Sequence, residues 1–219
     1  MIRKITGIIA MLCNLIVAQA QDRLTLDLTA GISRNMLSGN QLENLSNYGT
    51  VQRGYNVIIG LSVFNPITPS FGLKNEVLYS PTTVILHLND GNQPVYKSKL
   101  SRRIIQLYPL SPAFHYKNLQ ISAGPYWGIV AGGSIQRKDQ QGNLFKDHTI
   151  YGSSASSGGY LHKWDLGISG TLAYTLSSKL HIGLRYTQGF IALTENTAEQ
   201  QQQQVYSKYT SLAVGYRLF

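Results

Sequence analysis

The chain has 219 residues with 19 Lys and Arg against 10 Asp and Glu, which gives a formal net charge of +9. This length suits a single domain. The one cysteine, Cys13, lies in an apolar N-terminal segment, so the rest of the chain has no thiol for a disulfide or thiolate catalysis. No run of Lys and Arg exceeds two residues, and we therefore expect no nucleic-acid partner.

Residues 1–20 have the features of a secretory signal peptide. Arg3 and Lys4 supply a charged start, an apolar run follows from Ile5 to Val17, and Ala18-Gln19-Ala20 supplies a small-x-small cleavage site. We predict that residues 1–20 are removed on export. The mature domain is then 21–219, with a net charge of +7.

Beyond this segment, apolar residues recur at every second position, the pattern expected of strands with one apolar face. Pro109 and Pro112 interrupt one run, where we predict a bulge. The eight runs are 24–33, 55–63, 71–80, 102–114, 119–131, 164–174, 180–190 and 206–219.

The connections between runs alternate in length. Short turns centre near residues 67, 117 and 178, whereas long polar connections centre near 43, 90, 148 and 199. Outer-membrane barrels have short periplasmic turns and long extracellular loops. In a bilayer the sheet must also close on itself, because the backbone N–H and C=O groups of an unpaired strand edge would have no hydrogen-bond partners. We therefore predict an all-β fold, an eight-stranded antiparallel transmembrane β-barrel. By default we expect disorder in the loop 132–163 and the glutamine run 200–204.

Aromatic residues occupy outward-facing positions near both ends of the predicted strands, as in the girdles of membrane proteins. The alternative is that they form the core of a soluble β-sandwich. Phe219, the last residue, is predicted to be an assembly signal for insertion by the barrel-assembly machinery. The predicted girdle residues are Phe71, Tyr174 and Tyr216 near the short turns, and Tyr55, Tyr79, Trp164 and Phe190 near the long loops.

Charged residues of both signs fall on the inward phase, in a lumen just wide enough for side chains. They should pair, because an uncompensated buried charge is costly. A structural plug is the preferred interpretation, and the alternative is a narrow channel for small polar solutes with Glu76 and Arg185 at a constriction. The predicted lumen charges are Asp27, Lys74, Glu76, Asp165, His181 and Arg185.

Catalysis is not expected. Asp147-His148, the serines near Ser154 and His162 beside Asp165 leave open a third alternative, a hydrolase at the barrel rim acting on lipid or peptide. The five histidines lack paired ligand spacing, so we expect no metal and no cofactor. Expected partners are outer-membrane lipid and lipopolysaccharide, attracted by scattered Lys and Arg, and another envelope protein.

The order and spacing of several stretches match a known family: Phe71–Ser80, Leu107–Leu110, Gly124–Tyr126, Asp165–Gly170, Tyr174, Leu184–Tyr186 and Gly189. On these stretches the chain resembles the PorT-like family of small outer-membrane β-barrels of Bacteroidetes-type bacteria. The resemblance implies a barrel in the cell outer membrane without a catalytic site, and some members assist protein secretion. We thus expect a structural or accessory role in the envelope. In the usual terminal signature an aromatic residue stands two positions before the final Phe, whereas this chain has Arg217 there.

Overall fold

The computed structural model describes residues 24–39, 42, 46, 51–89, 94–151, 161–193 and 205–218. The predicted signal peptide and Phe219 lie outside these residues. Within them, no helix is long and apolar enough to cross a membrane. The strands are β1 (Thr25–Gly39), β2 (Val51–Gln52), β3 (Gly54–Thr68), β4 (Phe71–Leu88), β5 (Tyr96–Tyr116), β6 (Leu119–Lys138), β7 (Leu144–Asp147), β8 (Trp164–Thr175), β9 (Leu180–Gly189) and β10 (Val205–Arg217).

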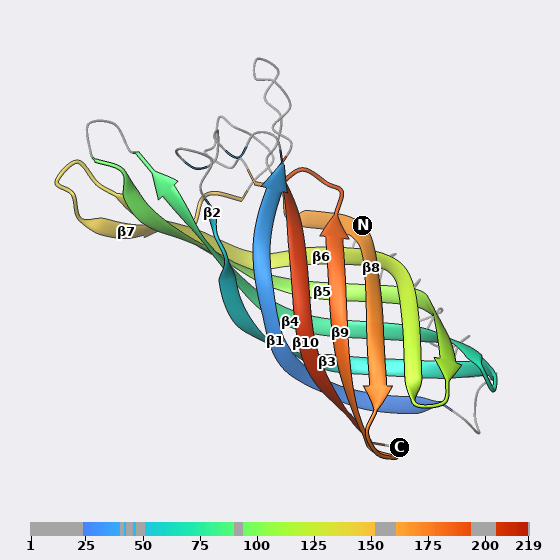
Figure 1. The fold of residues 1–219 in the computed structure, drawn as a ribbon. Coiled ribbons are helices and arrows are strands. Elements are labelled where there is room, and N and C mark those ends of the chain that lie inside the picture. Colours follow the sequence, from blue (N-terminus) through green and yellow to red (C-terminus); the bar gives the residue numbers. More distant parts are fainter. Residues whose placement is uncertain are drawn as a thin grey trace.

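Eight of these strands form a closed ring, in which each pairs antiparallel with its neighbours in the chain and β1 pairs with β10 (Figure 1). Going round the ring, the order is β4-β3-β1-β10-β9-β8-β6-β5, and the pairing of β4 with β5 closes it. The short β2 pairs with β4, and β7 pairs with β6. The prediction of an eight-stranded antiparallel β-barrel is confirmed.

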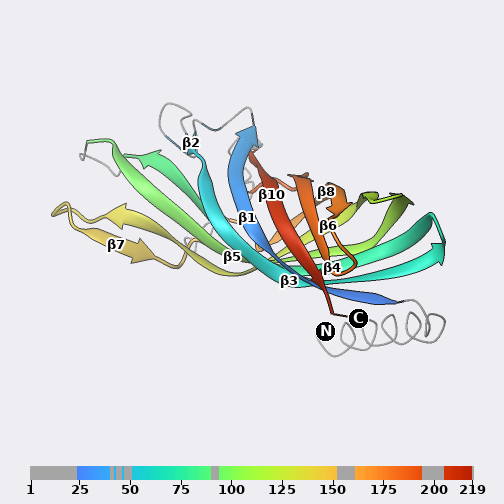
Figure 2. The same cartoon turned by 60° about the horizontal axis from the view of Figure 1, so that its bottom comes forward.

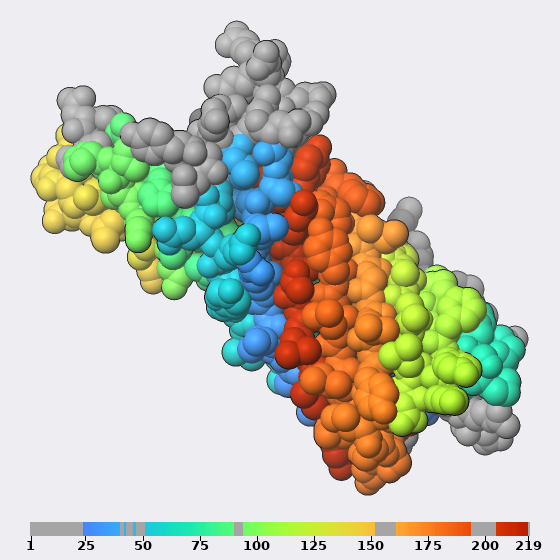
Figure 3. Space-filling model, in the orientation of Figure 1, coloured from blue at the N-terminus to red at the C-terminus, as the bar shows by residue number. Residues whose placement is uncertain are grey.

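The outer wall of the ring is apolar. In Figure 3 strands β1, β10, β9 and β8 lie side by side and form a continuous surface. Their outward positions hold large apolar side chains that stay exposed, including Leu28, Ile32, Leu172, Leu184, Leu212 and Val214. Their inward neighbours are small or polar, such as Thr29, Ser33, Ser169 and Ser211, and are buried. The alternation that predicted the strands therefore separates an apolar exterior from a polar interior.

Five strands are longer than predicted: β1 runs on to Gly39, β3 to Thr68, and β4, β5 and β6 are extended furthest. The ends of β4, β5 and β6 project beyond the rest of the barrel together with β7 (Figures 1 and 2). The expectation of polar loops over 81–99 and from residue 132 is wrong for these segments, because buried Val84, Leu86, Leu100 and Ile135 keep one apolar face. Disorder is also wrong for the described part of 132–163, which contains β7 and a buried Ile150.

The predicted bulge in the proline-containing strand is confirmed. The register of β4 with β5 shifts between Lys74 and Glu76, and Leu110 has a positive φ of 50°. The Leu110 N–H donates to Asn75 Oδ1 at 2.8 Å. Asn75 interrupts the apolar outer face of β4 because its side chain satisfies the backbone of this bulge.

Candidate functional site

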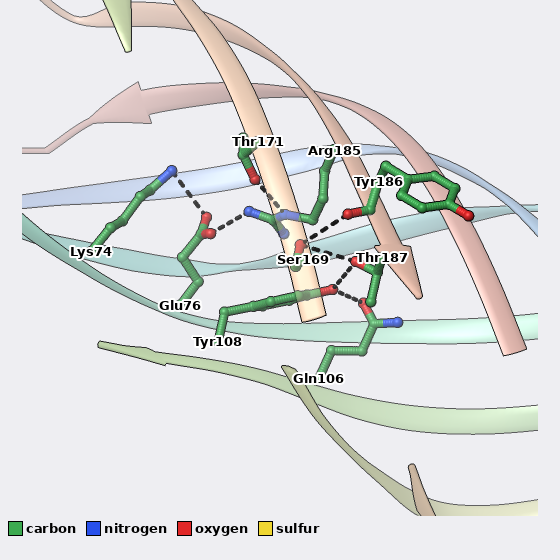
Figure 4. A network of polar contacts seen from close by, with 9 residues as sticks. All are labelled: Lys74, Glu76, Gln106, Tyr108, Ser169, Thr171, Arg185, Tyr186 and Thr187. Atoms are coloured by element: carbon green, nitrogen blue, oxygen red, sulfur yellow. Dashed lines mark hydrogen bonds and ion pairs between the residues drawn. The ribbon is translucent and has the colours of Figure 1, made fainter. Parts of the chain in front are cut away.

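An ion-paired cluster crosses the lumen toward the short-turn end of the barrel (Figure 4). Lys74 and Glu76 lie two apart on β4, so both face inward, and Lys74 Nζ is 3.1 Å from Glu76 Oε1. The other carboxylate oxygen, Oε2, accepts from the Arg185 guanidinium on β9. All three side chains are more than nine-tenths buried. One carboxylate thus bridges two cations from opposite walls.

Hydrogen bonds and a cation–π contact extend this cluster to β5 and β8. Arg185 Nε donates to Thr171 Oγ1 at 3.0 Å, and its guanidinium carbon lies 4.3 Å from the Tyr108 ring centroid. The Tyr108 hydroxyl donates to Gln106 Oε1 at 3.1 Å. The network continues through Thr187, whose hydroxyl donates to Ser169 Oγ at 3.1 Å. Four strands are therefore joined through the lumen.

Two other predicted lumen charges lie near this cluster. His181 lines a cavity of about 20 Å³ together with Lys74, Glu76 and Arg185, which has room for about one water molecule. Asp27 is buried on β1, with Oδ1 3.5 Å from Arg217 Nε on β10. This ion pair joins the first and last strands of the ring.

Asp165 does not join the other predicted charges. Its Oδ2 accepts from the hydroxyls of Tyr126 and Tyr209, both at 3.3 Å. Nearby, the buried Arg102 guanidinium lies 3.3 Å from Ser207 Oγ and 3.5 Å from the Tyr209 hydroxyl. Asp165 and Arg102 thus belong to a second polar cluster, built on tyrosines.

Glycines make room for this second cluster. A Cβ on Gly128 would lie 2.3 Å from the Tyr126 hydroxyl, and one on Gly189 would lie 2.4 Å from Asp165 Oδ1. Any side chain at these positions would collide with the polar groups beside it. The glycines therefore permit close packing of the lumen, an interior role that the strand pattern alone does not specify.

Apolar packing fills the rest of the interior toward the long-loop end. Around the tyrosines, a first cluster contains Ile58, Leu78, Ile104 and Val130. Beyond it lies a second cluster, here called the apolar cap. The cap consists of Leu37, Val84, Leu86, Leu100, Ile135, Ile150, Leu161, Leu193 and Val205. The described side chains thus form successive polar, aromatic and aliphatic levels along the barrel axis.

The predicted girdle residues lie on the outside of the barrel. Trp164 stacks on Trp127 with ring centroids 5.5 Å apart, and Phe71 packs on Phe114 at 5.0 Å. Around the long-loop end, Tyr79, Ile105, Ile129 and Trp164 follow one another in register across four strands. The exposed large side chains among the predicted set are Tyr55, Tyr79, Trp164, Tyr174, Phe190 and Tyr216.

Asp147 and His148, two of the residues considered for hydrolysis, contact groups outside the predicted set. Asp147 Oδ1 accepts from the Thr149 backbone and hydroxyl, and Oδ2 lies 3.1 Å from Arg137 Nε. His148 Nδ1 lies 3.2 Å from the Gly133 carbonyl oxygen rather than facing a hydroxyl. Ser154 lies outside the described residues. Among described residues, no three metal-binding side chains gather.

The main interior residues missed from the sequence are Arg102, Tyr108, Tyr126 and Tyr209. Arg102 is the first residue of a predicted strand that prolines interrupt, so the alternation did not indicate which way its side chain faces. Tyr126 is followed by Trp127, and two successive aromatic residues do not reveal which one faces inward. The inward phase set by Gly124, Gly128 and Val130 on β6 was the available signal for Tyr126.

Comparison with known proteins shows a shared fold and little sequence similarity. No family model matches the chain, and no curated protein matches it in sequence. Ail of Yersinia pestis, solved with the heparin analogue sucrose octasulfate, aligns over 90% of this chain and 99% of its own, with a TM-score of 0.51 and 9% identity. Neisserial surface protein A aligns over 89% and 99%, with a TM-score of 0.48 and 11% identity. OprG of Pseudomonas aeruginosa aligns over 91% and 98%, with a TM-score of 0.46 and 10% identity.

Proposed function

We propose that this chain is an outer-membrane β-barrel with a closed lumen and a structural or accessory role in the cell envelope. Membrane insertion is supported by the apolar outer wall, because exposed Leu, Ile and Val around a whole ring suit hydrocarbon. The fold, shared with Ail, agrees with this placement. In this proposal the protein has no catalytic activity.

The filled lumen is the observation that supports an accessory role over transport. Glu76 is held between Lys74 and Arg185, and the apolar cap lies across the long-loop end. A permeating ion would have to separate buried ion pairs and then pass a dry aliphatic layer, and each step has a high electrostatic cost. The barrel therefore acts as a rigid support for its extracellular segments.

Single-channel recording tests the closed lumen. We expect the full-length protein, purified from membranes and inserted into planar bilayers, to give no steady unitary conductance. Glu76→Ala and the exposed-surface control Lys179→Ala are recorded in parallel. Steady steps in the wild-type protein whose size changes in Glu76→Ala alone would contradict the proposal and favour the narrow channel.

The finer proposal is that the role is exercised on an envelope protein, as in members of the PorT-like family that assist secretion. Its support is the sequence resemblance, which covers much of residues 54–219. Crosslinking in native membranes followed by purification should recover one partner in a fixed ratio. If the barrel is recovered alone at every crosslinker concentration, the partner proposal fails while the closed barrel remains.

A further inference from the structure

The projecting sheet of β4–β7 has a basic outer face. On β5, Tyr96, Ser98, Leu100 and Arg102 are buried toward the interior, so Lys97, Lys99 and Arg103 face outward and are exposed. Lys99 pairs across the strands with Ile85, so these two residues share the outer face. Leu86, the next residue of β4, therefore lies on the opposite face. On β7, the exposed Lys146 is the partner of Gln136 on β6. Cations from two strands thus meet on one face.

A groove of about 490 Å³ lies in this face, here called the basic groove. Its lining contains no carboxylate among the described residues, and neither Arg103 nor Lys146 forms an ion pair with a described residue. Gly132 makes room for the Arg103 guanidinium, since a Cβ there would lie 2.8 Å from its NH2 nitrogen. The polar side chains of the lining that carry the argument are Thr83, Ser101, Arg103, Ser134, Lys146 and His148.

The basic groove begins directly above the row of outward residues at the long-loop end that contains Tyr79, Ile105, Ile129 and Trp164. Arg103 is the next outward residue after Ile105, which lies in register with Tyr79 and Ile129. Two residues of a strand span about 6.6 Å, so Arg103 reaches just past the level where girdle aromatics meet lipid headgroups. On the other side of this row, Leu107 and Trp127 continue the apolar wall.

We propose that the basic groove binds a phosphate group of a phosphorylated outer-leaflet glycolipid whose acyl chains lie on the apolar wall below. A guanidinium offers two parallel donors to phosphate oxygens, and an ammonium and hydroxyls complete the shell. The inference rests on the proposed membrane placement of the barrel. The continuous apolar wall favours a lipid over a soluble anionic polymer, which would gain nothing from apolar contacts.

The test uses the full-length protein in zwitterionic detergent micelles and lipid A carrying two phosphates as the probe. Binding is followed by native mass spectrometry and by titration. Removing one charge-assisted contact should weaken binding about tenfold in Arg103→Ala and in Lys146→Ala. Lys179→Ala, an exposed lysine in the short turn after β8, is the matched control and should bind as the wild type does. Lipid A with its phosphates removed should bind at least tenfold more weakly.

Each alternative source of the anion gives a separate result. If inorganic phosphate binds as tightly as lipid A, the apolar wall contributes nothing and the lipid assignment is overturned. If heparin binds through Arg103 and lipid A does not, the groove takes a soluble sulfated polymer instead. Equal binding of lipid A with and without phosphates also overturns the inference.

Folding and insertion are measured separately for every variant by the shift of the unheated protein on denaturing gels. A variant that loses this shift is replaced by Arg103→Gln or Lys146→Gln, which keep the side-chain length and remove the charge. If the wild-type chain fails to insert into bilayers, the proposed function fails. If it inserts and shows no phosphate-dependent binding, only the present inference fails.

Discussion

The most informative perturbation is Glu76→Gln, which keeps the shape of the side chain and removes its charge. The substitution would leave Lys74 and Arg185 as neighbouring cations with no carboxylate between them. At the observed 3.1 Å from Lys74 Nζ, the gross attraction lost is about 5 kcal/mol for an effective dielectric constant of about 20. Breaking a buried ion pair by removing one partner costs about 3–5 kcal/mol. We expect the free energy of unfolding to fall by that amount.

The assay is equilibrium unfolding in urea of the protein folded into phospholipid vesicles. Tryptophan fluorescence follows the barrel wall directly, because Trp127 and Trp164 stack on its outer surface. A loss smaller than about 1 kcal/mol is the size expected of solvated ion pairs. That result would refute the view that the cluster is dry and that it closes the lumen.

Two controls separate charge burial from a general packing defect. Asp139→Asn removes a carboxylate from an exposed turn, where Asp139 accepts from Asn143, and should leave the unfolding free energy close to the wild-type value, because the charge is solvated. The double variant Lys74→Met with Glu76→Gln removes one of the unpaired cations. It should recover part of the loss, since neighbouring substitutions in one network are non-additive.

Three further predictions concern the lumen and the projecting sheet. Gly128→Ala should destabilise the barrel by about 1–3 kcal/mol, because its Cβ would meet the Tyr126 hydroxyl, whereas Gly170→Ala has open space and should be neutral; urea unfolding compares them. Leu86→Ala should cost about 2–5 kcal/mol in the same assay, because Leu86 is fully buried in the apolar cap. Partial burial raises the pKa of Asp147, but hydrogen bonds from Thr149 and the charge of Arg137 outweigh it and hold the pKa below its usual value. Stability from this lowered pKa is present above the unfolded pKa of about 3.9 and lost as the pH falls, so the protection factor of the Thr149 amide, measured by hydrogen exchange and corrected for the intrinsic rate at each pH, should fall on acidification in wild type, and Asp147→Asn should abolish that dependence.

The strands and their closure could be predicted because period-two alternation leaves few other solutions once the loop lengths are known. The same alternation predicted that Glu76 and Arg185 face the lumen, since both occupy inward positions of regular strands. That the lumen charges would pair was predicted from burial, but which charges contact each other could not be derived, because the contact depends on the stagger of β4 against β9, which are not adjacent in the ring. The tyrosine cluster around Asp165 was missed for a similar reason: its members come from β6, β8 and β10.

The extended ends of β4–β6 were missed because the polarity of the alternation reverses along each strand. Near Val77 and Tyr79, outward residues are apolar and the inward residue Glu76 is charged. Past Thr82, the inward residues Val84 and Leu86 are apolar, whereas the outward residues include the polar Thr83 and His87 beside Ile85. A prediction based on apolar outward residues therefore places the end of each strand at the reversal and assigns the remaining residues to a polar loop.

In the proposed membrane placement, this reversal also locates the edge of the hydrocarbon. On β5 it falls between Ile105, which is exposed and apolar, and Lys99, which is exposed and charged, and Arg103 lies between them. Arg103 pairs with Pro81 on β4 and Gly132 on β6, so the three strands reverse at the same height. In that placement, lipid explains the apolar exterior below this level, and water explains the aliphatic interior above it. The apolar cap is then the core of a water-exposed sheet, and the proposal that the lumen is closed assigns the same core a second role at the end of the barrel beneath it.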